Sequence, residues 1–124
     1  MEFGDWYVAI VPILVGMGIL GFWISAVATG RVPEIESGRI EIRFHIVAEV
    51  VTGLVLIAGG LAVVVDGGAP STVVLSSIGL GMLSYTLIVS PGYYVDRHNK
   101  PAVVMFAAIW LLTIPVIALR FFLL

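Results

Sequence analysis

Long apolar runs dominate this sequence, and short polar clusters near Gly30, Asp66 and Pro91 interrupt them. A helix needs about 20 apolar residues to cross the hydrocarbon core of a bilayer, and each run reaches about that length. We therefore predict an all-α fold, in which four membrane-spanning helices form an antiparallel bundle in a single domain over 1–124. The predicted spans cover residues 6–29, 44–65, 72–90 and 101–119.

Glycine and proline mark where the predicted helices begin and end. Gly30 follows the first apolar run and suits the left-handed conformation that stops a helix. Ser90-Pro91-Gly92 should end the third helix, because proline disfavours a helical conformation in the residue before it. Pro101 suits the first position of the fourth helix, and Pro115 should kink or loosen its last turn.

Composition supports a membrane protein and excludes several other classes. Hydrophobic residues make up 60% of the 124 positions and charged residues only 11%, whereas soluble domains carry about 25% charged residues. The absence of cysteine excludes disulfides and thiolate metal sites. A net charge of −2 does not favour nucleic-acid binding, and no motif calls for a cofactor. The acidic start MEFGDWYV does not resemble a secretory signal, so we expect the first apolar run to remain as a helix.

Basic residues predict the orientation in the membrane. Five of the six lie in two loops, namely Arg31, Arg39 and Arg43 between the first two spans and Arg97 and Lys100 between the last two. Arg120, near the far end of the last span, is the exception. Positive charge favours the cytoplasmic side of a bilayer. We therefore predict a multi-pass protein of the cell membrane with these two loops in the cytoplasm and both termini outside.

Small and polar residues at helical spacing predict which faces pack together. Helices in lipid associate through small residues and interhelical hydrogen bonds, because lipid is as apolar as leucine. The predicted faces are Gly21, Ser25 and Thr29 in the first span, His45, Glu49, Thr52, Gly53, Leu56, Gly59 and Gly60 in the second, and Ser77, Gly81 and Ser84 in the third. Such faces suit contacts within one chain and contacts between copies equally well.

Glu49 is the most informative residue for function. It lies six residues, or about 9 Å, beyond Arg43, where an ionised carboxylate in hydrocarbon is costly and is commonly functional. His45 lies one turn earlier on the same face. We predict a ligand or proton site in the cytoplasmic half, made of Glu49, His45, Tyr85, Ser84 and Ser25. The alternative is that hydrogen bonds to Glu49 only fix the register of the helices.

Two weaker patterns suggest further sites on the cytoplasmic side. His45, Glu49, Asp96 and His98 have the ligand types of a tetrahedral metal site, although their spacing matches no known signature. Tyr93, Tyr94, Arg97 and Lys100 would form a docking loop for a partner protein or for anionic lipid head groups. The alternative for this loop is a solvated connection that carries positive charge.

Three functions fit these observations, in a definite order. A transporter or channel with Glu49 as its working carboxylate comes first, because a carboxylate in hydrocarbon is more than packing requires. It would be oligomeric, because four helices alone leave little room for a pathway. A non-catalytic accessory subunit of a membrane complex comes second. A membrane enzyme acting on a lipid-soluble substrate comes third, since no catalytic motif is present. The expected partners are the lipid bilayer and either further copies of the chain or a larger membrane complex.

Overall fold

The computed structural model describes residues 3–30, 40–96 and 98–123, without the side chains of residues 93, 96 and 123. Its elements are α1 (Phe3–Ala28), α3 (Ile40–Asp66), α4 (Pro70–Asp96), α5 (Lys100–Ala118) and a final π-helical turn, η1 (Leu119–Leu123). The predicted all-helical fold is confirmed, with four helices long and apolar enough to cross a membrane. Helices of this kind suggest a multi-pass membrane protein.

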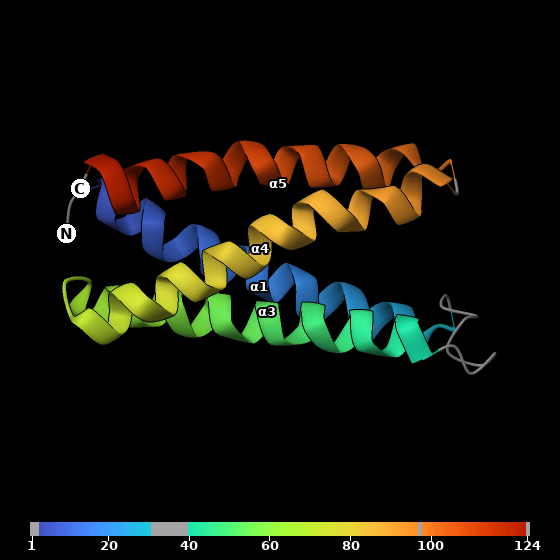
Figure 1. The fold of residues 1–124 in the computed structure, drawn as a ribbon, viewed down its shortest axis with the longest axis horizontal. Coiled ribbons are helices and arrows are strands. Elements are labelled where there is room, and N and C mark those ends of the chain that lie inside the picture. The colour runs from blue at the N-terminus through green and yellow to red at the C-terminus, as the bar shows by residue number, and fades with distance from the viewer. Residues whose placement is uncertain (1–2, 31–39, 97, 124) are drawn as a thin grey trace.

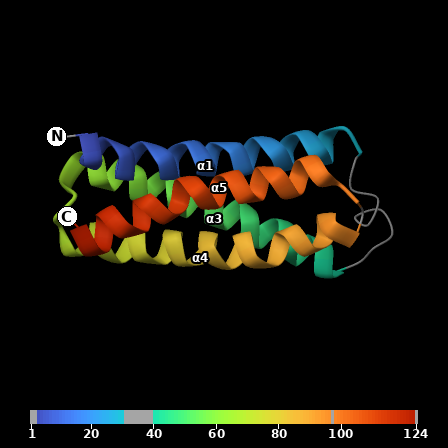
Figure 2. The same ribbon diagram turned by 90° about the horizontal axis from the view of Figure 1, so that it is seen from above.

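Each helix runs in the direction opposite to the one before it, and both ends of the chain lie at the same end of the molecule (Figure 1). We call the half where α1 begins and α5 ends the terminal half, and the half where α1 ends and α5 begins the loop half. Helices α1 and α4 lie on opposite sides, with α3 and α5 between them (Figure 2). Helix α4 crosses diagonally, so it lies beside α3 in the terminal half and beside α5 in the loop half (Figure 1).

The most extensive interface joins α1 to α3, and small residues spaced by seven along each helix build it. Ala9 and Gly16 on α1 face Gly60 and Gly53 on α3. A Cβ atom added at Gly60 would lie 2.5 Å from the carbonyl oxygen of Ala9, and one added at Gly16 would lie 2.5 Å from that of Gly53. No larger residue fits at either glycine, so the two backbones approach as closely as helices can.

The structure agrees with the predicted packing face of α3 and corrects the other two. The α3 face is buried from Glu49 to Gly60. In contrast, Gly21 of α1 and Gly81 of α4 are exposed, and nothing lies within 4 Å of a Cβ atom built at either. Helix α1 is apolar on almost all sides, and α4 carries polar residues on both its buried side (Ser76) and its exposed side (Ser77), so the contrast between apolar and polar residues does not reveal which side faces inward.

Helix α4 continues past Pro91 to Asp96, so the predicted end at Ser90 is wrong. Proline has no N–H group, which leaves the carbonyl four residues earlier, at Leu87, without its helical partner. The indole Nε1 of Trp110 on α5 donates a hydrogen bond of 3.3 Å to this carbonyl oxygen. A side chain from another helix therefore satisfies the group that Pro91 frees, and the sequence around Pro91 gives no sign of it.

Two other helix ends depend on local chemistry, and the sequence predicted the one at Gly30. Gly30 has a positive φ of 68°, as expected for a residue that ends a helix. The side chain of Asn99 accepts a hydrogen bond from the N–H of Ala102 and caps the start of α5. The last turn of the chain widens into η1, from which Arg120 Nη2 donates a hydrogen bond of 2.6 Å to the Gly67 carbonyl. This bond ties the end of the chain to the turn after α3.

Candidate functional site

A carboxylate and an imidazole on one turn of α3 form the polar centre of the loop half. Glu49 Oε2 lies 2.6 Å from His45 Nε2, so one of these atoms donates a hydrogen bond to the other. The Glu49 side chain is only 8% exposed, and that of His45 is 32% exposed. Within the described residues, the other carboxylate oxygen, Oε1, has no hydrogen-bond partner. The hydroxyl of Thr52, three residues further along α3, donates to the Ala48 carbonyl of its own helix and not to Glu49.

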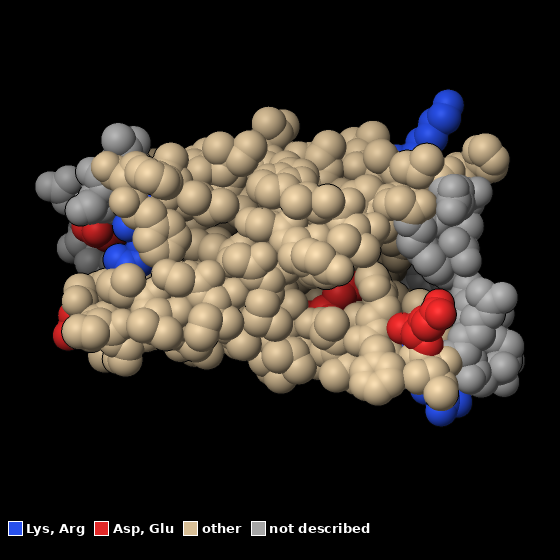
Figure 3. Space-filling view, in the orientation of Figure 1, with Lys and Arg blue, Asp and Glu red and all other residues tan. Residues whose placement is uncertain are grey.

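Glu49 borders a groove of 280 Å³ between α1 and α5. The groove lining is mostly apolar and contains no Lys, Arg or His side chain. Its lining residues are Leu14, Val15, Gly18, Ile19, Phe22, Trp23, Glu49, Tyr94, Met105, Phe106, Ile109 and Leu112. Figure 3 shows the face on which α4 lies in front of α1. A small patch of Asp or Glu atoms is visible near the middle of this face, between α3 and α4. Because the groove lining joins Glu49 of α3 with residues of α1, α4 and α5, this carboxylate lies between the hairpin of α1 and α3 and the hairpin of α4 and α5.

A continuous series of aromatic rings crosses the loop half beside this carboxylate and involves all four helices. The Trp23 ring packs edge to face against His45, with centroids 6.0 Å apart, and against Phe22, at 5.2 Å. Tyr94 of α4 then lies 6.4 Å from Phe22 and 5.7 Å from Phe106 of α5. Within this series of rings, the Phe22–Tyr94 contact joins the hairpin of α1 and α3 to the hairpin of α4 and α5.

Comparison with known protein families gives one match over almost the whole chain. A family model described as Domain of unknown function (DUF8058) matches residues 5–123. The chain belongs to the DUF8058 family. Comparisons with curated proteins and with solved structures find no match. The matched region of DUF8058 contains every residue of the groove and the His45–Glu49 pair, so the site lies within the family domain.

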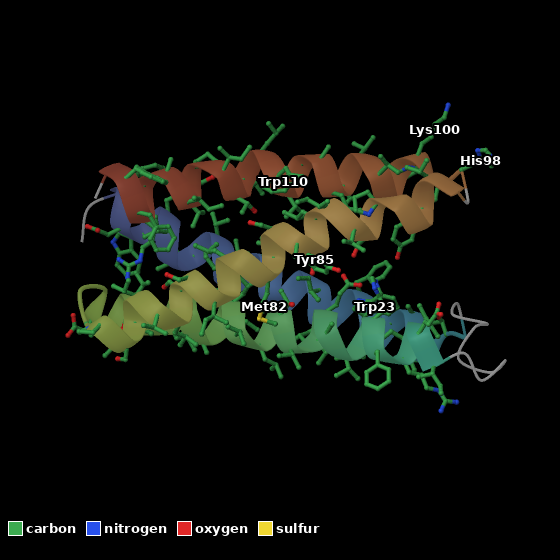
Figure 4. The ribbon with its side chains drawn as sticks, in the orientation of Figure 1. Trp23, Met82, Tyr85, His98, Lys100 and Trp110 are labelled. Carbon is green, nitrogen blue, oxygen red and sulfur yellow. The ribbon has the colours of Figure 1, made fainter. Side chains whose placement is uncertain are left out.

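Of the five residues predicted for the ligand or proton site of this DUF8058 protein, His45 and Glu49 are brought together. Tyr85 is 69% exposed on α4, and no hydrogen bond joins it to Glu49 (Figure 4). The Ser84 hydroxyl donates to the Leu80 carbonyl of its own helix, and Ser25 is exposed on α1. The inward face of α4 includes Leu83 and Leu87, which leaves Tyr85, two residues or about 200° from each, on the opposite side.

The predicted metal site is only partly described. Within the described residues, no group of three or more His, Asp or Glu side chains is arranged to hold a metal ion. His45 and Glu49 are in contact, whereas His98 lies exposed beyond the end of α4 (Figure 4). The side chain of Asp96 lies outside the described residues.

The predicted docking loop divides in a similar way. Lys100 is exposed and points away from the bundle (Figure 4). Tyr94 is half-buried between Phe22 and Phe106, so it contributes to the interior and not to the loop surface. Arg97 and the side chain of Tyr93 lie outside the described residues.

The aromatic walls of the groove are the part of the site that the sequence did not predict. Trp23 and Phe106 are buried although they lie in spans that are apolar all round, and nothing near them in the sequence marks them as inward-facing. One signal does exist. Trp23 follows Ala9 and Gly16 at the same spacing of seven, so the face that packs on α3 points to it.

Proposed function

We propose that this chain spans the cell membrane four times and acts as a proton-linked transporter, with Glu49 and His45 as the site that exchanges a proton for a solute. One observation carries the proposal. A carboxylate in the middle of an apolar bundle has one oxygen on His45 and the other without a partner, and it borders an open groove. Packing alone does not require such a group, and an ionisable side chain at this depth typically marks an ion or substrate pathway.

The basic residues set the orientation of this transporter. Arg43, in the first turn of α3, and Lys100, the first residue of α5, both belong to the loop half and would lie at the cytoplasmic face. The groove beside Glu49 would then be nearer the cytoplasm, and the closely packed terminal half would be nearer the outside. This arrangement corresponds to an inward-facing state of a transporter.

A complete pathway would need more than one copy of the chain. The groove between α1 and α5 ends at Leu14 and Leu112, near the middle of both helices, so it does not cross the bundle. Gly21 on α1 and Gly81 on α4 face outward with nothing near them, and such faces allow helices from another chain to approach closely. We therefore include a homo-oligomer in the proposal.

The same outward faces also favour the second candidate, an accessory subunit of a larger membrane complex. In that case the helices packed against Gly21 and Gly81 would belong to a different protein. Purification from the native membrane separates the two candidates, since a defined homo-oligomer supports transport and a constant second protein supports the accessory role.

Proton movement in liposomes tests the transport proposal directly. Purified protein is reconstituted with a pH-sensitive dye inside, and gradients of quaternary ammonium ions, sugars and amino acids are applied in turn. We expect at least one solute to drive proton movement with the wild type and with Glu41→Gln, whose exposed carboxylate lies outside the groove. Glu49→Gln should abolish the movement, because an amide cannot exchange the proton. Equal rates for Glu49→Gln and wild type, or no rate above that of empty liposomes for any solute, would overturn the proposal.

A further inference from the structure

The groove combines three features that together define a class of ligand. Most of its lining is apolar, four aromatic rings surround its loop end, and a single acidic group borders it. The rings belong to Phe22, Trp23, Tyr94 and Phe106. Aromatic faces attract cations, most strongly where water is scarce. The carboxylate of Glu49 adds a full negative charge or a hydrogen-bond acceptor at the same place.

The charge balance of the groove favours a cation over an anion or a neutral molecule. Among the described residues, no Lys, Arg or His side chain lines it, so an anion would meet no positive partner there. His45 contacts Glu49 but does not itself line the groove. A neutral apolar molecule would fit the walls but would leave the free oxygen of Glu49 without a partner, which is unfavourable for a buried polar atom.

The rim of the groove indicates how the ligand enters. Leu14, Phe22 and Leu112 lie at its edge and are largely exposed on the outer surface of the bundle. In a membrane these residues face hydrocarbon, so the groove opens sideways into lipid and not along the bundle axis. A molecule that first dissolves in the bilayer can reach Glu49 without crossing the closely packed terminal half.

We infer that the groove between α1 and α5 binds a lipophilic monocation, with its apolar body against the aromatic walls and its charge on the free oxygen of Glu49. This inference rests on the transport function proposed above and names its substrate class. The volume of 280 Å³ accommodates a small aryl or alkyl ammonium ion and lies near the lower limit of ordinary ligand pockets, which is about 300 Å³.

Binding of such a cation releases one proton. A net charge in hydrocarbon is costly, so we take the empty His45–Glu49 pair to carry no net charge and to share one proton across its 2.6 Å contact. When the cation pairs with the Glu49 carboxylate, that proton leaves and the imidazole of His45 is neutral, so charge is conserved. Among the groups packed against the pair, α4 contributes the titratable Tyr94, while the lining residues from α1 and α5 carry no titratable group.

A matched pair of probes tests the ligand class without any mutation. Benzyltrimethylammonium carries a fixed positive charge, and neopentylbenzene has the same shape without the charge. We expect the wild-type protein in detergent micelles to bind the cation at least about tenfold more tightly, as measured by calorimetry and by quenching of tryptophan fluorescence. Titrations in two buffers of different ionisation enthalpy should show release of about one proton for each cation bound. Equal affinity for the two probes would overturn the inference.

Variants then locate the site. Glu49→Gln should weaken cation binding by about tenfold or more and remove the proton release, and Trp23→Leu should weaken the binding by a smaller factor. Glu41→Gln should leave both unchanged. Glu49→Asp, which keeps the charge on a shorter side chain, should retain proton release at reduced affinity even if Glu49→Gln folds poorly. Unaltered cation binding by a folded Glu49→Gln protein would exclude this groove as the site.

The outcomes distinguish this inference from the proposed function. If benzyltrimethylammonium does not bind but another solute drives Glu49-dependent proton movement in liposomes, the ligand class is wrong and the transport function stands. If the cation binds with proton release but no solute drives proton movement, the binding site stands and the transport function is wrong.

Discussion

The same two helices, α1 and α3, pack against each other in both halves of the bundle, but the residues between them are small in the terminal half and large in the loop half. The positions that pack α1 onto α3 are Ala9 and Gly16 as far as the middle of the bundle, and Trp23 one repeat later. Opposite them on α3, the small Gly60 and Gly53 give way to Ile46, which packs against Trp23. Small residues let backbones touch, whereas large residues fill space between helices that stand further apart.

The partners of α4 change along the same axis. Near the terminal half a Cβ atom at Gly59 would lie 3.6 Å from the Ser76 backbone, so α3 and α4 are close there. In the loop half α4 has moved to α5, where Trp110 and Phe106 hold it. The hairpins α1–α3 and α4–α5 therefore meet tightly at one end and separate at the other. Glycines thus allow α1 and α3 to pack closely in the terminal half, and aromatic residues line a groove between the hairpins in the loop half.

The strongest way to break this contrast is to enlarge a glycine of the terminal half. Gly60→Ala places a Cβ atom 2.5 Å from the Ala9 carbonyl oxygen, so α1 and α3 must separate. We expect a loss of about 2 kcal/mol or more in the free energy of unfolding, as for other overpacked interiors. Reversible unfolding in mixed micelles of mild detergent and dodecyl sulfate measures the effect.

Gly92→Ala is the matched control, because this glycine is exposed in α4 and nothing lies within 4 Å of a Cβ atom at this position. Alanine favours helix over glycine by up to about 1 kcal/mol, so this variant should be as stable as the wild type or more stable. The two substitutions are chemically identical and should act in opposite directions. Similar losses for both would mean that the close α1–α3 contact contributes little.

How far the sequence predicts this structure depends on whether a feature is local. Gly30 and Asn99 end and begin helices through their own backbone and side-chain chemistry, so the ends near them were predictable. The α3 face was predictable because Glu49 and Thr52 make it polar. Gly21 and Gly16 lie on different faces of α1, and an apolar helix gives no indication of which stripe its neighbour will use.

Contacts between different helices account for the other features in which the structure differs from the sequence predictions. The continuation of α4 past Pro91 depends on Trp110, which comes from another helix. The level of Tyr85 along the bundle was predicted near that of Glu49, but its direction depends on how α4 is rotated in the bundle. The level of a residue along the bundle follows from counting residues at 1.5 Å each. The direction in which its side chain points follows only from how the helix packs against its neighbours. The sequence therefore predicted the part of the site that lies on α3, His45 and Glu49, but not the residues that other helices contribute.

A smaller effect is expected where α4 and α5 are joined in the loop half. Trp110→Phe keeps an aromatic ring but removes the N–H that satisfies the Leu87 carbonyl. We expect a loss of about 1 kcal/mol in the free energy of unfolding, measured in the same micelles. In a Pro91→Ala background the N–H of residue 91 can bond to Leu87, so Trp110→Phe should then cost much less. An equal cost in both backgrounds would show that the indole N–H does not compensate for the proline.

The smallest effect on stability is expected for a substitution of Phe22, which also tests access to the groove in the loop half. This side chain is already partly exposed, so Phe22→Ala should lower the free energy of unfolding by less than about 1 kcal/mol. It removes the ring contact with Tyr94 that links the two hairpins beside the groove.

Cysteine labelling measures access to the groove. Because the chain contains no cysteine, Ile19→Cys introduces a single thiol into the groove lining, and the rate at which this thiol reacts with N-ethylmaleimide in micelles measures how easily molecules enter the groove.

If the Phe22–Tyr94 contact limits entry to the groove, Phe22→Ala should raise the labelling rate of Ile19→Cys several-fold and leave that of Gly81→Cys, on an outward face of α4, unchanged. A rate increase at both positions would indicate general loosening of the bundle. No increase at either would mean that the groove admits molecules past the aromatic contact as it stands. The separation of the hairpins would then already be wide enough for a ligand, and the Phe22–Tyr94 contact would not limit entry.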